Sequence, residues 1–244
     1  MNAGNNLGKA LITGASSGIG AVYADRLAGR GFDLILVARD ESRLEKISKR
    51  LRAATGRNVE VLRADLTQKA DLERVERMLQ SDSEITLLVN NAGTAVAKPV
   101  IESDPGQLEQ MITLNVLALT RLSRAVAPAF VKRGSGALIN IASIVALSPG
   151  LVGGAYSATK SFVLNLTQAL HQELNGKGVR VQAVLPGVTT TELWERAGVS
   201  LNQLPSEIIM STEDMVDAAL VGFDRNELVT IPSLPNVQEW DAFE

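Results

Sequence analysis

Residues 9–20 read KALITGASSGIG, a short apolar run that passes directly into a turn with three glycines. AVYADRLAGR follows with helix-forming composition. Gly14 permits the tight turn, Gly18 allows a pyrophosphate to approach the backbone, and Gly20 lets the helix pack closely on the strand. The helix N-terminus would attract the phosphate charge. The spacing is G-x-x-x-G-x-G rather than G-x-G-x-x-G, so the prediction of a phosphate-binding turn depends on its position between strand and helix.

Beyond this turn, apolar runs alternate with helix-forming stretches along the whole chain. Most runs are continuously apolar, which is typical of parallel strands covered by helices on both faces. The expected helical stretches are 21–30, 41–55, 68–79, 105–133, 155–175 and 212–223. The expected strands are KALITG (9–14), DLILVAR (33–39), VEVLRADL (59–66), ITLLVNNAG (85–93), GALINIAS (136–143), VRVQAVLPG (179–187) and LVTIP (228–232).

This alternation predicts an α/β fold: a doubly wound (Rossmann), mostly parallel seven-stranded sheet with helices on both faces. Its ligands would bind at the carboxyl ends of the strands. No repeat, low-complexity segment or linker divides the sequence. Residues 1–244 are therefore expected to form a single NAD(P)-binding domain, with a cofactor half at about 8–143 and a catalytic and substrate half at about 144–244.

The composition excludes several classes of function. The chain of 244 residues has a net charge of -3, no cysteine, and a single histidine, His171, which we expect on an exposed helix face. Thiolate chemistry, a histidine metal cluster and a Ser-His-Asp triad are excluded, so no metal site is expected. The absence of a basic patch argues against nucleic acid as a partner. Without a signal sequence or a membrane-length apolar run, we expect a cytoplasmic protein with no membrane partner.

The end of the second strand, VARD (37–40), is where dinucleotide-binding folds read the adenosine ribose. An acidic residue at this point would bind the 2′-hydroxyl of NAD, whereas arginine accommodates the 2′-phosphate of NADP. Arg39 can offer a charge-assisted contact to a phosphate, and the side chain of Asp40 would leave in a different direction. The sequence therefore favours NADP, with NADPH preferred over NADH.

Tyr156 and Lys160 are four residues apart in AYSATK, thirteen residues after Ser143. On a helix, this spacing places a phenol and an ammonium group on the same face. A nearby cation favours the phenolate and lowers the pKa of the phenol from about 10. We therefore expect Lys160 to lower the Tyr156 pKa and produce an acid/base group that works near neutral pH.

Taken together, these motifs resemble those of the short-chain dehydrogenase/reductase family. They occur in the family's order over roughly residues 8–191. The matching segments are the cofactor turn TGASSGIG (13–20), Asp65 in ADL, NNAG (90–93), Asn115 in TLNVLAL, Ser143, Tyr156, Lys160 and the PGVTTT loop (186–191) with Thr191.

The resemblance implies a set of cofactor-binding residues drawn from these motifs and their neighbours. The set comprises Gly14, Ser16, Ser17, Gly18, Ile19, Gly20, Arg39, Asp65, Leu66, Asn91, Ala92, Gly93, Tyr156, Lys160, Pro186, Gly187, Val188, Thr189 and Thr191.

The resemblance also implies the catalytic roles. Ser143 would hydrogen-bond the substrate oxygen, and Tyr156 would exchange a proton with it while the nicotinamide exchanges a hydride with the adjacent carbon. Lys160 would lower the Tyr156 pKa and hold the nicotinamide ribose. Asn115 would position a water that relays protons from Lys160.

These roles predict an NADP-dependent oxidoreductase acting on a small-molecule ketone or aldehyde, or on the matching alcohol. The apolar loop TELWERAGVSLNQLPSEIIM (191–210) favours an uncharged apolar substrate, small or bulky, although ordinary helix packing would explain the same residues. One alternative is a 3-oxoacyl-thioester reductase. Another is a non-catalytic NADP-binding sensor or scaffold, although all four catalytic positions are filled.

Two further expectations concern surfaces. Apolar residues on a second face of the helices at 107–133 and 155–175 predict a homodimer or homotetramer. The tail at 233–244 carries Trp240 and Phe243, and it is expected to cover the core. The alternative for that tail is contact with a neighbouring subunit or with that subunit's substrate pocket.

Overall fold

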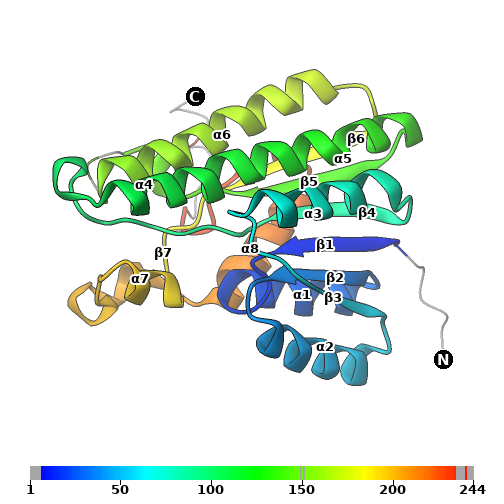
Figure 1. The fold of residues 1–244 in the computed structure, drawn as a ribbon, viewed down its shortest axis with the longest axis horizontal. Coiled ribbons are helices and arrows are strands. Elements are labelled where there is room, and N and C mark those ends of the chain that lie inside the picture. Colours follow the sequence, from blue (N-terminus) through cyan, green and yellow to red (C-terminus); the bar gives the residue numbers. More distant parts are fainter. Residues whose placement is uncertain (1–6, 149, 151, 235–239, 241–244) are drawn as a thin grey trace.

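The computed structural model describes residues 7–148, 150, 152–234 and 240, in which helices and strands alternate (Figure 1). Each expected strand and helical stretch is present. The elements are β1 (Lys9–Thr13), α1 (Gly18–Arg30), β2 (Asp33–Ala38), α2 (Glu41–Thr55), β3 (Val59–Arg63), α3 (Lys69–Ser81), β4 (Ile85–Asn90), η1 (Val100–Glu102), α4 (Pro105–Ile112), η2 (Thr113–Ala118), α5 (Leu119–Arg133), β5 (Gly136–Ile141), η3 (Ile144–Ala146), α6 (Gly154–Leu174), β6 (Val179–Val184), β7 (Val188–Thr189), α7 (Glu192–Arg196), η4 (Leu201–Gln203), η5 (Ser206–Ile208), β8 (Ile209–Met210), α8 (Thr212–Asp224) and β9 (Val229–Thr230).

Seven of the strands form one parallel sheet in the order β3-β2-β1-β4-β5-β6-β9. The predicted doubly wound sheet is therefore confirmed. The strand order reverses between β1 and β4, and in such sheets the crevice for ligands lies at this point. Several expected strands end earlier than predicted because their last residues, such as Asn91–Gly93, belong to the loops that line this crevice.

Helices cover both faces of the sheet. The apolar residues of α1, α2 and α8 pack on one face and those of α3, α5 and α6 on the other. Figure 1 shows these layers above and below the strands. Because both faces are covered, central strand residues such as Leu11, Ile12 and Leu88 are fully buried, which explains their continuously apolar sequence.

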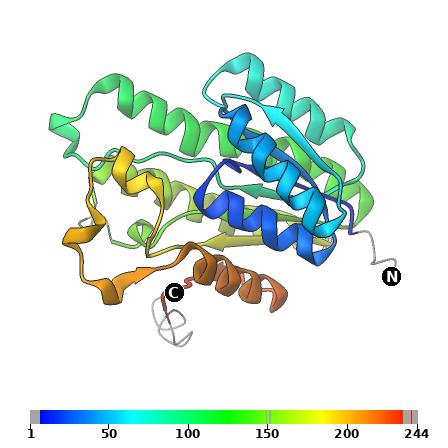
Figure 2. The ribbon, with the colours of Figure 1, turned by 90° about the horizontal axis from the view of Figure 1, so that it is seen from below.

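A second, two-stranded sheet was not expected from the sequence. β7 and β8 are parallel, with Val188 opposite Ile209 and Thr189 opposite Met210. This pairing closes residues 191–208 into a loop whose two ends are adjacent. Figure 2 shows the loop projecting at the same end of the molecule as α4.

The helix that runs through α4, η2 and α5 is long and apolar enough to cross a membrane by length and composition. Half of its most apolar 18-residue stretch is buried inside the protein, and Met111, Leu122 and Phe130 are fully buried. A core helix passes the same test, so the expectation of no membrane partner stays a prediction.

The C-terminal tail meets the core through Trp240. Its side chain is 9% exposed and belongs to an apolar cluster with Leu119, Val163 and Leu185. This contact agrees with the expected core-covering role. Phe243 lies outside the described residues.

The turn between α6 and β6 provides a test of the packing at the amino ends of the strands, opposite the crevice. Gly176 and Gly178 both have left-handed backbone conformations, with φ of 72° and 73°. A Cβ on Gly178 would collide with the Gly134 carbonyl oxygen, whereas a Cβ on Gly176 would meet nothing within 4 Å. We expect Gly176→Ala to lower the free energy of unfolding by about 1–2 kcal/mol, and Gly178→Ala by at least about 2 kcal/mol more.

Chemical denaturation of the two variants measures this difference directly, because they share the backbone penalty and differ in the collision. Equal destabilisation would show that the α6–β6 turn is not held against the α5–β5 turn.

Candidate active site

The glycine-rich turn after β1 is held in place by the loop after β4. The Thr13 hydroxyl accepts hydrogen bonds from the backbone N–H groups of Asn91 and Ala92, both at 3.0 Å. The Asn91 side chain donates to the carbonyl oxygens of Thr13 at 2.9 Å and Gly14 at 3.2 Å. A Cβ on Gly14 would lie 2.8 Å from the Asn91 amide nitrogen, so a larger residue would push the two loops apart.

On the opposite side of the crevice, α6 is fixed to the segment after β5. The Ser157 hydroxyl donates to the Val145 carbonyl and the Ser161 hydroxyl to the Ala146 carbonyl, both at 2.8 Å. Ser143 lies just before these carbonyls, and its hydroxyl accepts from the Val145 N–H at 3.4 Å. The helix register that presents Tyr156 is therefore tied to the segment that presents Ser143. The sequence analysis did not identify Ser157, a buried position of α6, or Ser161, a half-buried one.

Tyr156 and Lys160 project from the same face of α6, as expected, and both are buried, with exposures of 3% and 6%. The Lys160 Nζ lies 5.8 Å from the centre of the Tyr156 ring and donates to the Ile141 carbonyl at 2.9 Å. A carbonyl partner leaves the Lys160 charge without a counter-ion, so burial lowers the pKa of Lys160 to about 8.

The expected lowering of the Tyr156 pKa by Lys160 is wrong for this structure. Burial raises the pKa of Tyr156 to about 12, and the Ser143 hydroxyl acts in the opposite direction through a hydrogen bond. The desolvation of the phenolate is thus the larger effect. At neutral pH Tyr156 is protonated, which suits a group that donates a proton.

Asn115 lies in η2, a single π-helical segment that interrupts the long helix, as is frequent at functional sites. Its side chain accepts from the Thr94 N–H at 2.9 Å and donates to the Thr94 carbonyl at 2.8 Å. It also donates to the Thr159 hydroxyl at 3.1 Å. Both amide donors are used, so Asn115 joins α6 to the loop after β4. Its implied role of holding a water stays a prediction.

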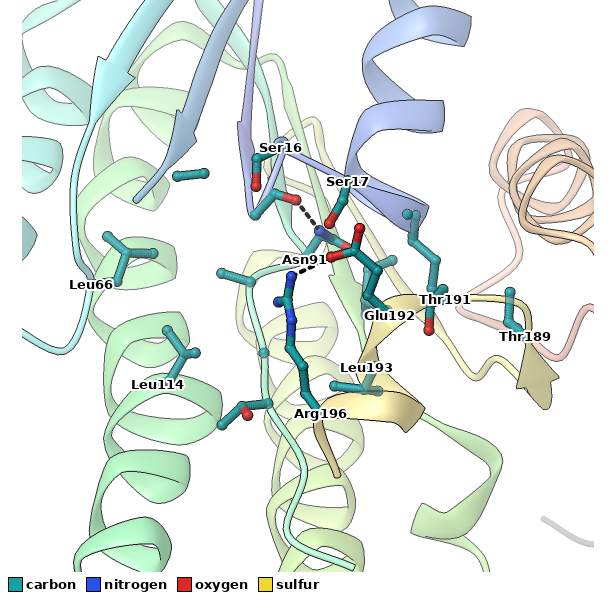
Figure 3. A pocket seen from close by; sticks show the side chains of 18 of the residues that line it. Ser16, Ser17, Leu66, Asn91, Leu114, Thr189, Thr191, Glu192, Leu193 and Arg196 are labelled. Atoms are coloured by element: carbon teal, nitrogen blue, oxygen red, sulfur yellow. Dashed lines mark hydrogen bonds and ion pairs between the residues drawn. The ribbon is translucent and has the colours of Figure 1, made fainter. Parts of the chain in front are cut away.

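A cavity of about 480 Å³ brings these parts together. Of the expected site residues, Gly20, Val188 and Asn115 do not line it. Gly20 lies against the Gly14 carbonyl, Val188 is in β7, and Asn115 lies behind Gly93. The expected residues that do line it are Gly14, Ser16, Ser17, Gly18, Ile19, Arg39, Asp65, Leu66, Asn91, Ala92, Gly93, Ser143, Tyr156, Lys160, Pro186, Gly187, Thr189 and Thr191. Figure 3 labels Ser16, Ser17, Leu66, Asn91, Thr189 and Thr191 among them.

The end of the cavity beside β2 contains two cations. Arg39 is exposed, lines the cavity and makes no ion pair among the described residues. Asp40 caps α2 by accepting from the Arg43 N–H at 3.0 Å, so its carboxylate faces its own helix. Sequence analysis missed Arg43, which lies in the first turn of α2, four residues after Arg39. Its guanidinium contacts the Glu192 carboxylate at 2.8 and 2.9 Å.

The wall over the other end of the cavity comes from the loop at 191–208. The Trp194 indole donates to the Thr189 carbonyl at 3.0 Å, and the Thr212 hydroxyl donates to the Thr190 carbonyl at 2.6 Å. Leu193 and Trp194 line the cavity. Leu193 also packs against an apolar cluster that includes Tyr156, Met111 and Val145. The surroundings of the tyrosine are therefore mostly apolar.

This arrangement combines a protonated phenol, a buried ammonium group and a glycine-rich turn at a helix N-terminus. A family model described as short chain dehydrogenase matches residues 8–200. The chain belongs to the short-chain dehydrogenase/reductase family. It is an oxidoreductase enzyme of that family, as the resemblance had implied.

Solved members of the family are similar over nearly the whole chain. A short-chain dehydrogenase from Sphingobium yanoikuyae in complex with NADPH is 53% identical, with a TM-score of 0.94, covering 97% of this chain and 91% of that one. The bulky-bulky ketone specific alcohol dehydrogenase from Comamonas testosteroni is 45% identical, with a TM-score of 0.90, covering 98% of this chain and 91% of that one.

A third relative is longer. The very-long-chain 3-oxoacyl-CoA reductase of Bos taurus is 34% identical over 188 residues, which are 75% of this chain. The match spans 60% of that reductase's length.

The buried charge of Lys160 predicts a gain in stability when it is removed. We expect Lys160→Met to raise the free energy of unfolding at pH 7 by about 1–3 kcal/mol, since a buried ammonium is replaced by an apolar side chain while the Ile141 carbonyl loses its donor. Between pH 8 and 10.5 the unfolded chain binds a proton that folded Lys160 has released, so the wild type gains stability as pH rises. The advantage of the variant should therefore shrink over this range.

Denaturation at pH 7 and pH 10 measures both effects, and Lys177→Met, at an exposed turn position, is the control expected to change little. A destabilised Lys160→Met at pH 7 would contradict the assignment of an unfavourable buried charge.

Proposed function

We propose that the protein is an NADP(H)-dependent oxidoreductase that interconverts uncharged, bulky apolar ketones or aldehydes and the corresponding alcohols. The observation that carries this proposal is the protonated Tyr156 hydroxyl in an apolar surrounding, within one cavity that also contains Ser143, Lys160 and the glycine-rich turn. A bound nicotinamide would supply or accept the hydride at the substrate carbon.

The residues of the chain perform the proton chemistry. In the reducing direction Tyr156 donates its proton to the carbonyl oxygen, while the Ser143 hydroxyl hydrogen-bonds that oxygen and orients it. The resulting phenolate is buried and therefore unfavourable, so the reaction needs a group that returns its proton. Because burial lowers the pKa of Lys160 to about 8, this residue can return a proton to Tyr156 near neutral pH.

The structure fits a dinucleotide cofactor. The turn at 14–18 leaves backbone N–H groups at the N-terminus of α1, a helix of 13 residues, facing the cavity. Arg39, free of an ion pair among the described residues, supports NADP over NAD. The Asp40 carboxylate, which would favour NAD, is used as a helix cap.

Two further features support a bulky apolar substrate. Leu193 and Trp194 line the cavity, and Leu193 packs on the apolar cluster that includes Tyr156. The similar Comamonas testosteroni enzyme is a bulky-bulky ketone specific alcohol dehydrogenase. The similarity to the Bos taurus reductase supports a 3-oxoacyl-thioester as a second candidate. The alternative of a non-catalytic scaffold is dropped, since the chain is an oxidoreductase of this family and Ser143, Tyr156 and Lys160 line the same cavity.

We also propose that the chain forms a homodimer or homotetramer in the cytoplasm. Ile112, Leu117 and Phe162 are 49%, 48% and 41% exposed on the long helix and on α6. Apolar side chains of this size on helix surfaces support association between copies of the chain.

Tyr156→Phe should reduce turnover of a diaryl ketone with NADPH by about 10³-fold, because the proton donor is lost. The affinity for NADPH should remain within about twofold of wild type, since the ring and Lys160 remain. Steady-state kinetics and fluorescence titration measure the two quantities. Acetone and a 3-oxoacyl-thioester serve as comparison substrates, and near-normal turnover in the variant would remove Tyr156 from the mechanism.

Arg39→Ala should weaken NADPH binding by about tenfold or more, the loss expected for a charge-assisted contact to a phosphate. NADH binding should be nearly unchanged. Arg77→Ala, which removes the same charge from an exposed position on α3, is the matched control. If both cofactors lose affinity equally, Arg39 does not read the 2′-phosphate.

A further inference from the structure

Three charged side chains form a cluster over the dinucleotide cavity. Arg43 comes from α2, whereas Glu192 and Arg196 come from the short helix α7 at the start of the loop. The Glu192 carboxylate binds the Arg43 guanidinium at 2.8 and 2.9 Å, and it also binds the Arg196 guanidinium. Glu192 therefore holds two cations from the two halves of the protein, while Asp40 makes a second, longer ion pair with the Arg43 guanidinium, at 3.4 Å.

The cluster lies at the phosphate-binding part of the cavity. Thr191, the residue before Glu192, has its methyl group 3.3 Å from the position that a Cβ on Gly18 would take. Arg43, Glu192 and Arg196 all line the cavity, together with Ser16 and Ser17 of the turn. Figure 3 shows Glu192 and Arg196 reaching toward the turn that carries the two serines.

The charges in this cluster are suited to exchange. The three side chains are 45%, 41% and 57% exposed, in the order Arg43, Glu192, Arg196, and ion pairs with this exposure contribute little net stability. Guanidinium groups bind phosphate as readily as carboxylate, through two parallel hydrogen bonds. A phosphate that enters the cavity can therefore replace Glu192 at modest cost.

We propose that Arg43 and Arg196 are phosphate-binding residues of the cofactor site and that Glu192 is their internal placeholder, which a dinucleotide phosphate displaces. This inference rests on the proposed use of a dinucleotide. It assigns two cofactor-binding residues beyond the family motifs. It also couples cofactor entry to the substrate loop, because displacement of Glu192 releases the link between α2 and α7.

An exchange of partners and a permanent Arg43–Glu192 ion pair predict opposite changes in cofactor affinity when the Glu192 charge is removed. If the Arg43–Glu192 pair remained closed over bound cofactor, removing the Glu192 charge would weaken dinucleotide binding. In the exchange, removing that charge releases Arg196 and leaves Arg43 with only its 3.4 Å contact to Asp40, so cofactor binding is strengthened. If Glu192 merely repelled the cofactor, removing its charge would also strengthen binding, but that gain would not require the arginines.

The test is a fluorescence titration of Glu192→Gln with NADPH and with NADH. Glu192→Gln should lower the Kd by about three- to fivefold, and Arg43→Met should raise it by about tenfold or more. In an Arg43→Met/Arg196→Met background, Glu192→Gln should change the Kd by less than about twofold, since its gain acts through the arginines. Equal changes for both cofactors would assign the exchange to the pyrophosphate, and changes with NADPH alone would assign it to the 2′-phosphate.

Glu195→Gln is the matched control, since it removes the same charge from an exposed position of α7 outside the cavity. Unchanged or weaker binding by Glu192→Gln, or a gain that persists without the two arginines, would overturn the inference. These outcomes concern affinity alone, so they are separable from failure of the proposed function, in which dinucleotides bind but no ketone, aldehyde or alcohol is turned over.

Discussion

The hydrogen-bonded junction between the ends of β1 and β4 determines where the rest of the site can lie. Four hydrogen bonds of 2.9–3.2 Å join the loop after β1 to the loop after β4, through the Thr13 hydroxyl and the Asn91 side-chain amide. They lie at the point where the strand order reverses. Connections leave this point toward opposite faces of the sheet, so a crevice opens that side chains do not fill. The turn at 14–18 forms one wall of the crevice. Gly93, which follows Asn91, brings the backbone close to Asn115 and Lys160 on the other.

The catalytic half of the crevice is built from buried polar groups that do not favour stability. Lys160 is buried against a carbonyl rather than a carboxylate, and its lowered pKa measures the cost of placing the ammonium group there. Tyr156 is likewise buried among apolar side chains, which raises its pKa. Three hydrogen bonds compensate by fixing α6 in one register: those that Ser157 and Ser161 donate to the segment after β5, and the one that Thr159 accepts from Asn115. The helix is thus held rigidly in a position that its own charged residue disfavours.

Patterns with a fixed period or spacing allowed most of the fold and much of the site to be predicted. Continuous apolar runs located the seven strands of the main sheet, and the glycine turn and the Tyr156–Lys160 spacing located both ends of the cavity. The unpredicted features depend on contacts between distant segments. The pairing of β7 with β8 joins two-residue strands too short to show a pattern, and the Arg43–Glu192 pair spans 149 positions. The direction of the Tyr156 pKa shift was predicted wrongly because spacing reveals a neighbouring charge but not the depth of burial.

The unpredicted contacts also explain how one segment can cover the cavity and still admit ligands. The β7–β8 pair and the Thr212–Thr190 hydrogen bond fix both ends of the loop at one place, so the segment between them is anchored at that point. Trp194 anchors the first turn of the loop to Thr189 from within. The remaining link to the cofactor half is electrostatic and exposed. Exposed ion pairs exchange partners at low cost, whereas backbone pairing and a buried indole do not. A charged ligand is therefore the kind of molecule that can release this link without unfolding the loop.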